Sequence, residues 1–409
     1  MRRDVRYGDG AVRRVPDVVA GLGARRVLLV CGGTSFDASG AASMLPDLER
    51  VATVHRWSGF AANTDAADLV RGLRIVEDFR PDLVLGVGGG SAMDMAKLLC
   101  AFPGVTDEDK LHHAIRAGDR ITSRVPRLVL VPTTSGSGSE ATHFAVVYIG
   151  DEKFSVAGPV LRPDVVVLDP SLTLSGSRYQ RATSGIDAVA QAIESMWAVG
   201  ATEASRRWAR HALGLLLPAI ETFVNEPDAG SARAMAIGSH LAGRAIDISK
   251  TTAAHALSYG ITKRYGISHG HAVALSLGGF IEAHSDAETF RLRTEVDRAR
   301  HEHIMAEVKR PLGAGSGAQA REHFNALLKR IGLIPVPLPA ASDVAEECRR
   351  VVGAVNVERL SNNPIVFDES ELAALVQESV VGLAVGGAPP LTGGAGADAR
   401  VVSNLVSPS

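Results

Sequence analysis

The sequence is poor in the features that mark secreted, membrane-bound or disulfide-bonded proteins. Only 3 of its 409 residues are cysteines, and Cys31, Cys100 and Cys348 form no closely spaced pair. They make neither a disulfide framework nor a thiolate zinc site, so we expect buried free thiols. No run approaches the roughly 18 apolar residues of a membrane span, and the first residues lack the apolar core of a signal peptide. We therefore expect a cytoplasmic protein with no membrane partner.

An excess of charge of either sign is also missing. The 43 Lys and Arg residues nearly balance the 45 Asp and Glu residues, which gives a net charge of −2. This balance argues against a basic surface that binds nucleic acid, but it leaves room for a few cations in one pocket. The apolar share of 46% and the charged share of 22% are ordinary for a globular chain, and the length predicts two or three domains. Glycine is abundant, with 42 residues, so the places where it clusters are informative.

Short apolar runs alternate with amphipathic stretches over the first 170 residues. We predict strands at Arg26–Cys31, Val51–Trp57, Leu83–Val87, Leu128–Val131 and Val165–Leu168. Continuous apolar strands separated by helices, such as the one expected at Ala66–Phe79, are typical of a parallel sheet covered on both faces. A hairpin is expected at His143–Val156, with its turn at Gly150 and Asp151.

After Pro170 the strand pattern gives way to helical spacing. We predict helices at Thr183–Val199, Ser205–Val224, Ser231–Ser249, Thr251–Tyr265, His271–Ala283, Asp286–Val308, Ala318–Ile331, Val344–Val352 and Glu369–Val381. The last residues are rich in Gly, Ala, Pro and Ser, which is typical of a frayed tail. The sequence therefore predicts an α/β domain at residues 1–175, an all-helical domain at 176–385 and a low-complexity tail at 386–409.

Two glycine-rich loops follow predicted strands and are suited to hold a dinucleotide. The first, Gly88-Gly89-Gly90-Ser91, leads into a helix that we expect to start near Ala92, where free N–H groups and the helix dipole favour a phosphate. Asp94, in the first turn, could accept from ribose or amide donors or simply balance the dipole. The loop lacks GxGxxG spacing, and an ordinary strand-to-helix turn is the alternative.

The second loop, at 132–140, offers hydroxyl groups and bare backbone directly after another strand. Its candidates for ribose and phosphate are Thr133, Thr134, Ser137 and Ser139, although a polar surface turn is the alternative. Ligands bind at the carboxyl ends of parallel strands, so both loops could line one crevice. At the end of the first predicted strand, Gly32 and Gly33 stand where an NAD-selective site usually has an acidic residue. Both NADH and NADPH therefore stay open.

Several polar residues of the helical half share helix faces or lie close together in the sequence. Asp187 and Gln191 are four residues apart and share a helix face, as do His255 and Tyr259, and His269 follows 14 residues after His255. Taken singly, a helical histidine is more often a packed or surface residue than a ligand.

Together with the strings GGGSAMDMAK and PTTSGSGSE, in this order and spacing, these residues resemble the iron-dependent (group III) alcohol dehydrogenase family. The resemblance covers about residues 6–380 and includes ERLSNNP at 358–364, which is similar to the family's C-terminal NP element. It implies a Rossmann-like dinucleotide-binding α/β domain and an all-α domain, the fold that the family shares with dehydroquinate synthase. It also implies a homodimer, NAD(P)H bound in part by Lys153, and a divalent metal in the cleft between the domains.

The family's metal ligands correspond here to Asp187, Gln191, His255 and His269. Gln191 departs from the pattern, because the family has a histidine at this place. A glutamine carbonyl oxygen is a neutral, hard donor, so we expect a weaker site that favours Fe2+ over Zn2+.

Tyr259 is a second departure, since family members commonly have a histidine there that is invoked in proton transfer. The catalytic candidates are therefore His255, His269, Tyr259 and His271. Water or a ribose hydroxyl are the other proton sources, and plain packing is the alternative for Tyr259.

The strings DAVAQAIESMW and SKTTAAHALSYGITKRYGISHGHAVAL look most like the phosphonoacetaldehyde reductase branch of this family. That branch reduces phosphonoacetaldehyde to 2-hydroxyethylphosphonate in phosphonate natural-product biosynthesis. A phosphonate needs cations and hydroxyl donors near the metal, and the candidates are Lys250, Thr251, Thr252 and Arg264, with Lys250 at the expected helix N-terminus. The alternative is that the threonines only cap the helix while the cations stay in solvent.

These inferences predict NAD(P)H-dependent reduction of a small aldehyde to a primary alcohol, with no nucleic-acid or membrane partner. One alternative is a general alcohol dehydrogenase of the same family that acts on simple alcohols or hydroxy acids. Another is a lyase like dehydroquinate synthase, which uses NAD without net redox change and which the Asp187 and Gln191 face fits poorly. The last is a non-catalytic homologue that has lost its metal through Gln191.

Overall fold

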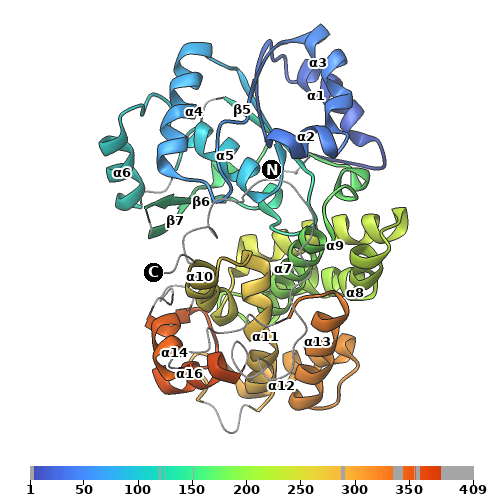
Figure 1. The fold of residues 1–409 in the computed structure, drawn as a ribbon, viewed down its shortest axis with the longest axis vertical. Coiled ribbons are helices and arrows are strands. Elements are labelled where there is room, and N and C mark those ends of the chain that lie inside the picture. Colours follow the sequence, from blue (N-terminus) through green and yellow to red (C-terminus); the bar gives the residue numbers. More distant parts are fainter. Residues whose placement is uncertain are drawn as a thin grey trace, which may run out of the picture.

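The computed structural model of the chain has two parts, an α/β half above and a helical half below in Figure 1. It describes residues 4–378 with gaps at 119–120, 125, 151, 287–290, 335–343, 354 and 356–359. The predicted tail at 386–409 lies outside the described residues. Among the helices that are described, none has the length and apolar character needed to cross a membrane.

A parallel sheet of six strands forms the centre of the α/β half, in the order β1-β8-β5-β4-β2-β3. The strands are β1 (Asp4–Tyr7), β2 (Arg26–Cys31), β3 (Thr53–Trp57), β4 (Leu83–Gly88), β5 (Arg127–Pro132) and β8 (Val165–Leu168). All the strands predicted from continuous apolar runs are present, and the fold class expected from the sequence is confirmed. The sequence analysis missed β1, because its mostly exposed Asp-Val-Arg-Tyr run becomes a strand only by pairing with β8 at the sheet edge.

The sheet is buried on both faces, because side chains along each strand alternate between them. On β2, Leu28 and Val30 belong to one apolar cluster, whereas Val27 and Leu29 belong to the other. The first cluster lies under α4 (Ala66–Phe79), α5 (Gly90–Ala101) and α6 (Glu108–Ala117), and the second under α1 (Val15–Gly21), α2 (Gly33–Ala38) and α3 (Leu45–Val51). Figure 1 shows these two sets of helices on opposite sides of the sheet.

The predicted hairpin is present as the antiparallel strands β6 (Phe144–Ile149) and β7 (Glu152–Ala157). It lies at the lower edge of the α/β half, facing α10 (Ala253–Tyr265) of the helical half (Figure 1). The hairpin therefore brings side chains of the first half to the boundary with the second.

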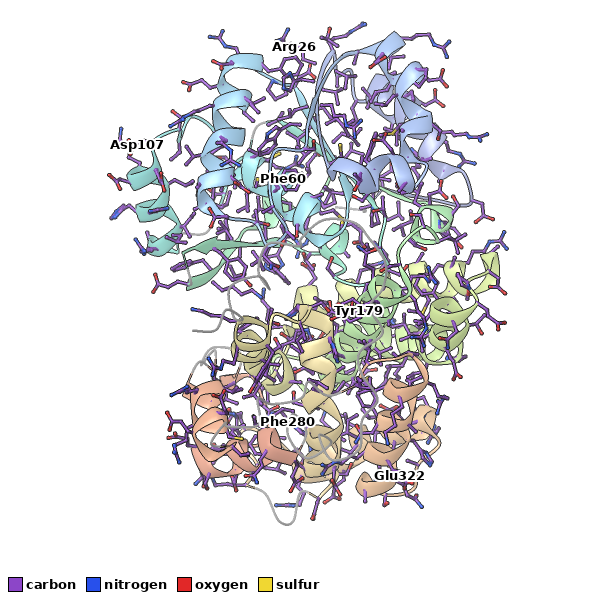
Figure 2. The ribbon with its side chains drawn as sticks, viewed as in Figure 1. Arg26, Phe60, Asp107, Tyr179, Phe280 and Glu322 are labelled. Carbon is purple, nitrogen blue, oxygen red and sulfur yellow. The ribbon has the colours of Figure 1, made fainter. Side chains whose placement is uncertain are left out.

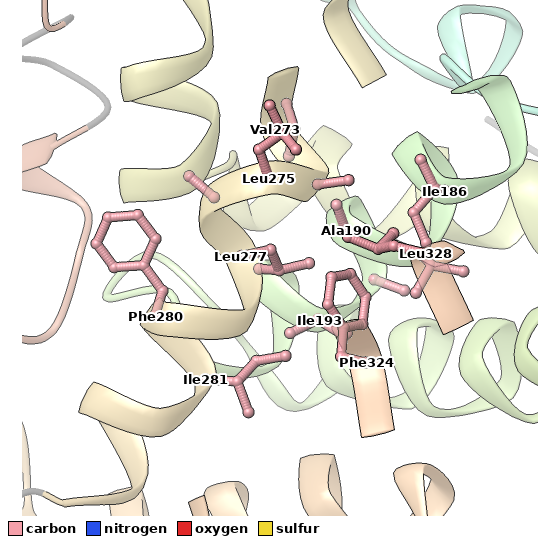
Figure 3. Close-up of a cluster of buried hydrophobic side chains, with 14 of the residues drawn as sticks. Ile186, Ala190, Ile193, Val273, Leu275, Leu277, Phe280, Ile281, Phe324 and Leu328 are labelled. Carbon is pink, nitrogen blue, oxygen red and sulfur yellow. The ribbon is translucent and has the colours of Figure 1, made fainter. Parts of the chain in front are cut away.

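The helical half packs around a large apolar core. Its helices are α7 (Arg178–Trp197), α8 (Glu203–Asn225), α9 (Ala229–Ser249), α10 (Ala253–Tyr265), α11 (His269–Ser285), α12 (Arg298–Lys309), α13 (Gly317–Arg330), α14 (Val344–Gly353) and α16 (Glu369–Val376). Figure 3 shows Ile193 of α7, Leu277 and Phe280 of α11, and Phe324 of α13 within this core. Burial of these faces makes α7 and α11 rigid supports for any polar residue on their remaining surface.

The helix expected at Asp286–Val308 is wrong in its first part. Residues 287–290 lie outside the described residues, and the helix that follows begins only at Arg298. Before it, Leu292 forms an antiparallel bridge with the distant Ile365. Pairing with a segment far along the chain has therefore overridden the local helical spacing.

The two halves are joined closely where the loop after β5 meets α9. A Cβ placed on Gly138 would lie 2.5 Å from Cα of Gly243, and one on Gly243 would lie 2.6 Å from the carbonyl oxygen of Gly138. Nearby, the buried Asp247 of α9 accepts from the backbone N–H of His143 at 2.7 Å and from Nε of Arg162 at 3.1 Å. The close backbone contact between these two glycines and the hydrogen bonds of the buried Asp247 thus hold α9 against the α/β half.

Candidate active site

A cavity of about 1070 Å³ lies where the two halves meet. Its walls come from the glycine loops and the hairpin on one side and from α7, α10 and α11 on the other. Tyr179, in the first turn of α7, lines the cavity and lies at the level of this boundary in Figure 2. The volume is in the range of cavities that bind a cofactor or a small ligand.

The two glycine loops meet at the carboxyl ends of β4 and β5. The N–H of Thr133 donates to the carbonyl of Gly88 at 2.9 Å, and a Cβ on Gly90 would lie 3.0 Å from Oγ of Ser137. Helix α5 begins at Gly90, two residues earlier than expected, so the glycine turn forms the helix N-terminus itself. The cofactor candidates that line the cavity are Gly90, Ser91, Asp94, Ser137, Ser139 and Lys153, whereas Gly32, Gly33, Gly88, Gly89, Thr133 and Thr134 are not among its lining residues.

The carboxylate of Asp94 forms its hydrogen bonds within the α/β half. Its carboxylate accepts from Oγ of Ser139 at 2.5 Å and from the N–H of Val146 at 3.0 Å. Burial raises its pKa, although the nearby Lys97 acts in the opposite direction. Lys97, which the sequence analysis did not assign to the site, is fully buried and donates to the carbonyls of Ser139 and Phe144 at 2.5 and 2.8 Å. It ends the GGGSAMDMAK string, and it holds the loop that forms one wall of the cavity.

Three of the expected metal ligands converge on the other side. Asp187, His255 and His269 each offer one donor atom, and these atoms all lie within 4.8 Å of one another. Oδ1 of Asp187 is 3.3 Å from Nε2 of His255 and 3.9 Å from Nε2 of His269. The carboxylate comes from α7, one imidazole from α10 and the other from the first residue of α11.

Gln191 adds a further oxygen donor to this group. Its Nε2 donates to Oδ2 of Asp187 at 3.0 Å and to the carbonyl of Ser137 at 3.3 Å, so Oε1 is its unused atom. Oε1 of Gln191 and Oδ1 of Asp187 are buried, and neither accepts a hydrogen bond of good geometry from the described part of the chain, although Nε2 of His255 lies 3.3 Å from Oδ1 of Asp187. Buried acceptors without donors are costly, and a divalent cation would satisfy both. The set of two oxygens and two imidazoles therefore fits a divalent metal.

Glu194 is a site residue that the sequence analysis missed. It lies two turns after Asp187 on α7, and its buried carboxylate accepts from Nδ1 of His255. It also accepts from the N–H groups of Thr252 and Ala254, both at 3.1 Å, and so caps the N-terminus of α10. Because Glu194 engages Nδ1, Nε2 of His255 is the atom that faces Asp187, as in other carboxylate-oriented metal ligands. The i+7 spacing from Asp187 could have revealed it.

The charges of this group are strongly coupled. Burial alone would lower the pKa of His255, but the negative charge of Glu194 and the contacts with Asp187 and Glu194 raise it to about 10. Burial would raise the pKa of both carboxyl groups, yet His255 holds the pKa of Asp187 and that of Glu194 below their usual values. Without a metal, the carboxylates of Asp187 and Glu194 therefore favour a protonated, positively charged His255 between them. A divalent cation bound at Nε2 of His255 would take the place of the proton on that atom.

The structure separates the remaining proton-donor candidates. Tyr259 lines the cavity, and its ring is nearly parallel to that of His269, with the centroids 6.0 Å apart. His271 is not a lining residue; its Nε2 bonds to the carbonyl of Ile334 at 2.9 Å, and its Nδ1 lies 3.3 Å from the hydroxyl of Tyr179. Burial lowers the pKa of His271, which favours a neutral ring.

Lys250 follows the end of α9 instead of standing at a helix N-terminus. It has a φ of 62°, which is unusual for a residue with a side chain, and Nδ2 of Asn362 donates to the carbonyls on either side of it. These carbonyls belong to Ser249, at 2.8 Å, and Thr251, at 3.0 Å. Nζ of Lys250 is 4.3 Å from the ring centroid of Phe144, which lines the cavity. Asn362 lies in the late segment that resembles the NP element, and it holds this turn in place.

The other anion candidates have different surroundings. Thr251 lines the cavity, whereas Oγ1 of the buried Thr252 donates to Glu194 at 2.8 Å. Arg264 forms two hydrogen bonds to Glu347, at 2.8 and 2.6 Å, and is not a lining residue, so the structure does not bring it to the cavity. Its neighbour Lys263 does line the cavity.

Comparison with known proteins gives two matches to family models. Residues 3–170 match the model for iron-containing alcohol dehydrogenase, and residues 181–380 match the model for the C-terminal part of the Fe-containing alcohol dehydrogenase family. Phosphonoacetaldehyde reductase of Streptomyces viridochromogenes is 32% identical over 341 residues, which cover 82% of this chain and 84% of that protein. Long-chain-alcohol dehydrogenase 1 of Geobacillus thermodenitrificans is 31% identical over 66% of this chain and 69% of its own length.

Solved structures share the fold over nearly the whole chain. Sulfoacetaldehyde reductase from Bifidobacterium kashiwanohense, solved in complex with NAD+, has a TM-score of 0.80 at 24% identity, covering 93% of this chain and 97% of its own. An iron-containing alcohol dehydrogenase from Thermotoga maritima has a TM-score of 0.77 at 24% identity, covering 93% of this chain and 98% of its own. Together with the family models, these results show that the chain belongs to the iron-containing alcohol dehydrogenase family and is an NAD(P)-dependent enzyme of the alcohol dehydrogenase and aldehyde reductase type.

Proposed function

We propose that the chain reduces phosphonoacetaldehyde, a small aldehyde with an anionic head group, to 2-hydroxyethylphosphonate. The observation that carries this proposal is that the metal donors and two lysines, Lys153 and Lys263, line the same cavity. A cation near the carbonyl site is what a phosphonate requires. The 32% identity to a phosphonoacetaldehyde reductase over 82% of the chain supports the same substrate.

The side chains of the site have separate tasks in this reaction. Asp187, Gln191, His255 and His269 would hold a divalent metal, which supplies a Lewis acid for the carbonyl, while NADH or NADPH supplies the hydride. Glu194 orients His255, and the carbonyl of Ser137 fixes the amide of Gln191 so that Oε1 stays available.

The α/β half provides the other wall of the site. Lys97 and Asp94 fix the loop from Ser139 to Phe144, so the hydroxyl groups and the Phe144 ring keep their places at the cavity. The free backbone of Gly90 at the start of α5 suits the pyrophosphate of the cofactor. The protein thus contributes orientation and electrostatics to chemistry that the cofactor supplies.

Spectrophotometric assays of NADH and NADPH oxidation test this proposal. Purified protein is incubated with iron(II), zinc(II) or a chelator, and the kcat/KM for phosphonoacetaldehyde is compared with that for propanal. We expect a preference for phosphonoacetaldehyde of at least about tenfold, the effect of one charge-assisted contact. Equal kcat/KM values would instead support a general alcohol dehydrogenase of the same family.

The neutral oxygen of Gln191 supports a further proposal about the metal. A hard, neutral donor suits iron(II) better than zinc(II), so we propose that Fe2+ is the working metal. Metal analysis of protein purified without air tests this, and a protein that holds no metal and oxidises no NAD(P)H would be the non-catalytic homologue. We also propose a cytoplasmic homodimer, which light scattering and cell fractionation would test.

A further inference from the structure

Ser258, on α10, contacts both histidines of the proposed metal site. It is fully buried, and its Oγ donates to the carbonyl of His255, three residues earlier, at 2.7 Å. The same Oγ lies 3.2 Å from Nδ1 of His269, the first residue of α11. One hydroxyl group therefore joins the helix that carries the first imidazole to the ring of the second.

The direction of the second hydrogen bond follows from the first. A serine hydroxyl has one proton to donate and two lone pairs that accept. The proton is used in the shorter bond, to the carbonyl of His255, which is a common bond for a serine inside a helix. Oγ of Ser258 then accepts from His269, so Nδ1 of that ring carries a proton. In the neutral ring this leaves the lone pair on Nε2, the form that binds a metal.

The orientation of the His269 ring agrees with this direction. Its Nε2 lies 3.9 Å from Oδ1 of Asp187, the same atom that Nε2 of His255 approaches at 3.3 Å. The His269 side chain is 35% exposed, whereas that of His255 is 5% exposed. Packing therefore holds the His269 ring less firmly, and its orientation depends more on the hydrogen bond at Nδ1.

We propose that Ser258 is a positioning residue that fixes the ring orientation and the Nδ1–H tautomer of His269. It acts on His269 as Glu194 acts on His255, but through a neutral hydroxyl instead of a carboxylate. A neutral acceptor forms the weaker hydrogen bond, so His269 is the less firmly oriented of the two imidazoles. The inference goes beyond the proposed function, but it rests on the metal role given there to His269.

Three variants test this role. Ser258→Ala removes the acceptor and suits the helix, because alanine has the highest helix propensity. Ser258→Thr keeps a hydroxyl oxygen that can form the same bonds. Ser276→Ala is the matched control, since Ser276 of α11 is also fully buried and donates to the carbonyl three residues earlier, that of Val273, at 3.3 Å. In the described part of the chain its hydroxyl forms no hydrogen bond with a histidine. Circular dichroism confirms that each variant is folded.

Metal affinity is the first readout, measured by competition for cobalt(II) between the protein and a chelator. We expect Ser258→Ala to weaken cobalt(II) binding by about tenfold, the lower end of the loss for a group that orients a histidine ligand. The cobalt(II) affinity of Ser276→Ala and the Kd of NADH for Ser258→Ala should stay within about threefold of the wild-type values, and Ser258→Thr should recover most of the metal affinity. A folded Ser258→Thr protein that binds as weakly as Ser258→Ala would contradict the role of the hydroxyl oxygen.

The ring proton of His269 is the second readout. In a cobalt(II) protein, the N–H protons of coordinated histidines give paramagnetically shifted NMR signals that exchange with solvent. We expect two such signals in wild-type protein and in Ser276→Ala, from His255 and His269, and the loss of one of them to exchange in Ser258→Ala. An unchanged pair of signals in Ser258→Ala would overturn the proposal.

The same measurements separate the two assignments. If wild-type protein binds no cobalt(II), the proposed metal site fails and the role of Ser258 fails with it. If wild-type protein and Ser258→Ala bind cobalt(II) equally well, the assignment of Ser258 alone is refuted.

Discussion

Replacement of Glu194 by glutamine tests the orientation of the metal site most directly. The carboxylate accepts from Nδ1 of His255 through one oxygen and from the N–H groups of Thr252 and Ala254 through the other. Glutamine has a single acceptor oxygen. If that oxygen stays with the end of α10, the amide NH2 group faces Nδ1, and His255 must give up its proton there.

The consequence falls on the atom that would bind the metal. A neutral imidazole that accepts at Nδ1 carries its proton on Nε2, which faces Asp187 at 3.3 Å and could no longer ligate. Loss of a carboxylate that orients a histidine ligand lowers metal affinity by about 10- to 100-fold. This corresponds to about 1.4 to 2.8 kcal/mol. We expect the upper part of this range, because only two imidazoles take part in the proposed site and Gln191 contributes a neutral amide oxygen.

The assay is competition between the protein and a chelator of known affinity, with iron(II) under nitrogen and with cobalt(II) as a spectroscopic probe. Glu140→Gln is the control, because Glu140 and His240 form another buried carboxylate–histidine contact, at 3.1 Å, outside the cavity lining. Circular dichroism confirms that each variant is folded. A folded Glu194→Gln protein with wild-type metal affinity would refute the reasoning.

Three further predictions follow from the site and the core. His269→Ala should lower kcat by at least about 100-fold while the Kd of NADH changes less than about threefold, because the residue belongs to the proposed metal site and not to the glycine loops; retention of most activity would contradict this. In chelator, the melting temperature should fall as the pH rises from 6.5 to 10. The pKa of His255 is about 10 in the folded protein and 6.5 for a free imidazole, so its stabilisation is complete only below pH 6.5 and is lost as the pH approaches 10. With metal bound this fall should be smaller, and parallel curves would contradict the assignment. Phe324→Ala should lower the free energy of unfolding by about 3–5 kcal/mol in urea titrations, since the ring is fully buried, whereas Phe324→Leu should cost much less.

The sheet and most helices could be predicted from the sequence because their signals are local. Continuous apolar runs gave β2, β4, β5 and β8, and the amphipathic pattern of Ala66–Phe79 matches α4. The strand β1 and the segment before α12 depend on pairing with distant residues, such as Ile365, and no local pattern reports such a partner. The helix start at Gly90 was also missed. Glycine has a low helix propensity, so the sequence pattern alone places the start of α5 after the glycine run.

In the candidate site, too, residues within recognisable motifs could be predicted, whereas residues whose role depends on a distant partner could not. The motif residues Asp187, Gln191, His255 and His269 lie close together, as the resemblance to the family led us to expect. Glu194 was missed although its spacing was visible, because a buried carboxylate reveals its role only when its partner on α10 is known. Arg264 was expected near the substrate, but a sequence cannot show that Glu347 of α14 neutralises it.

The contact between Gly138 and Gly243 limits how such proteins can be recombined. The two backbones touch where neither residue leaves room for a methyl group, and one glycine belongs to each half of the chain. A chimaera that joins this α/β half to the helical half of a relative must therefore inherit both glycines as a pair. The exchange unit for laboratory evolution is then the loop after β5 together with α9, and a crossover at the apparent boundary near residue 175 would separate them.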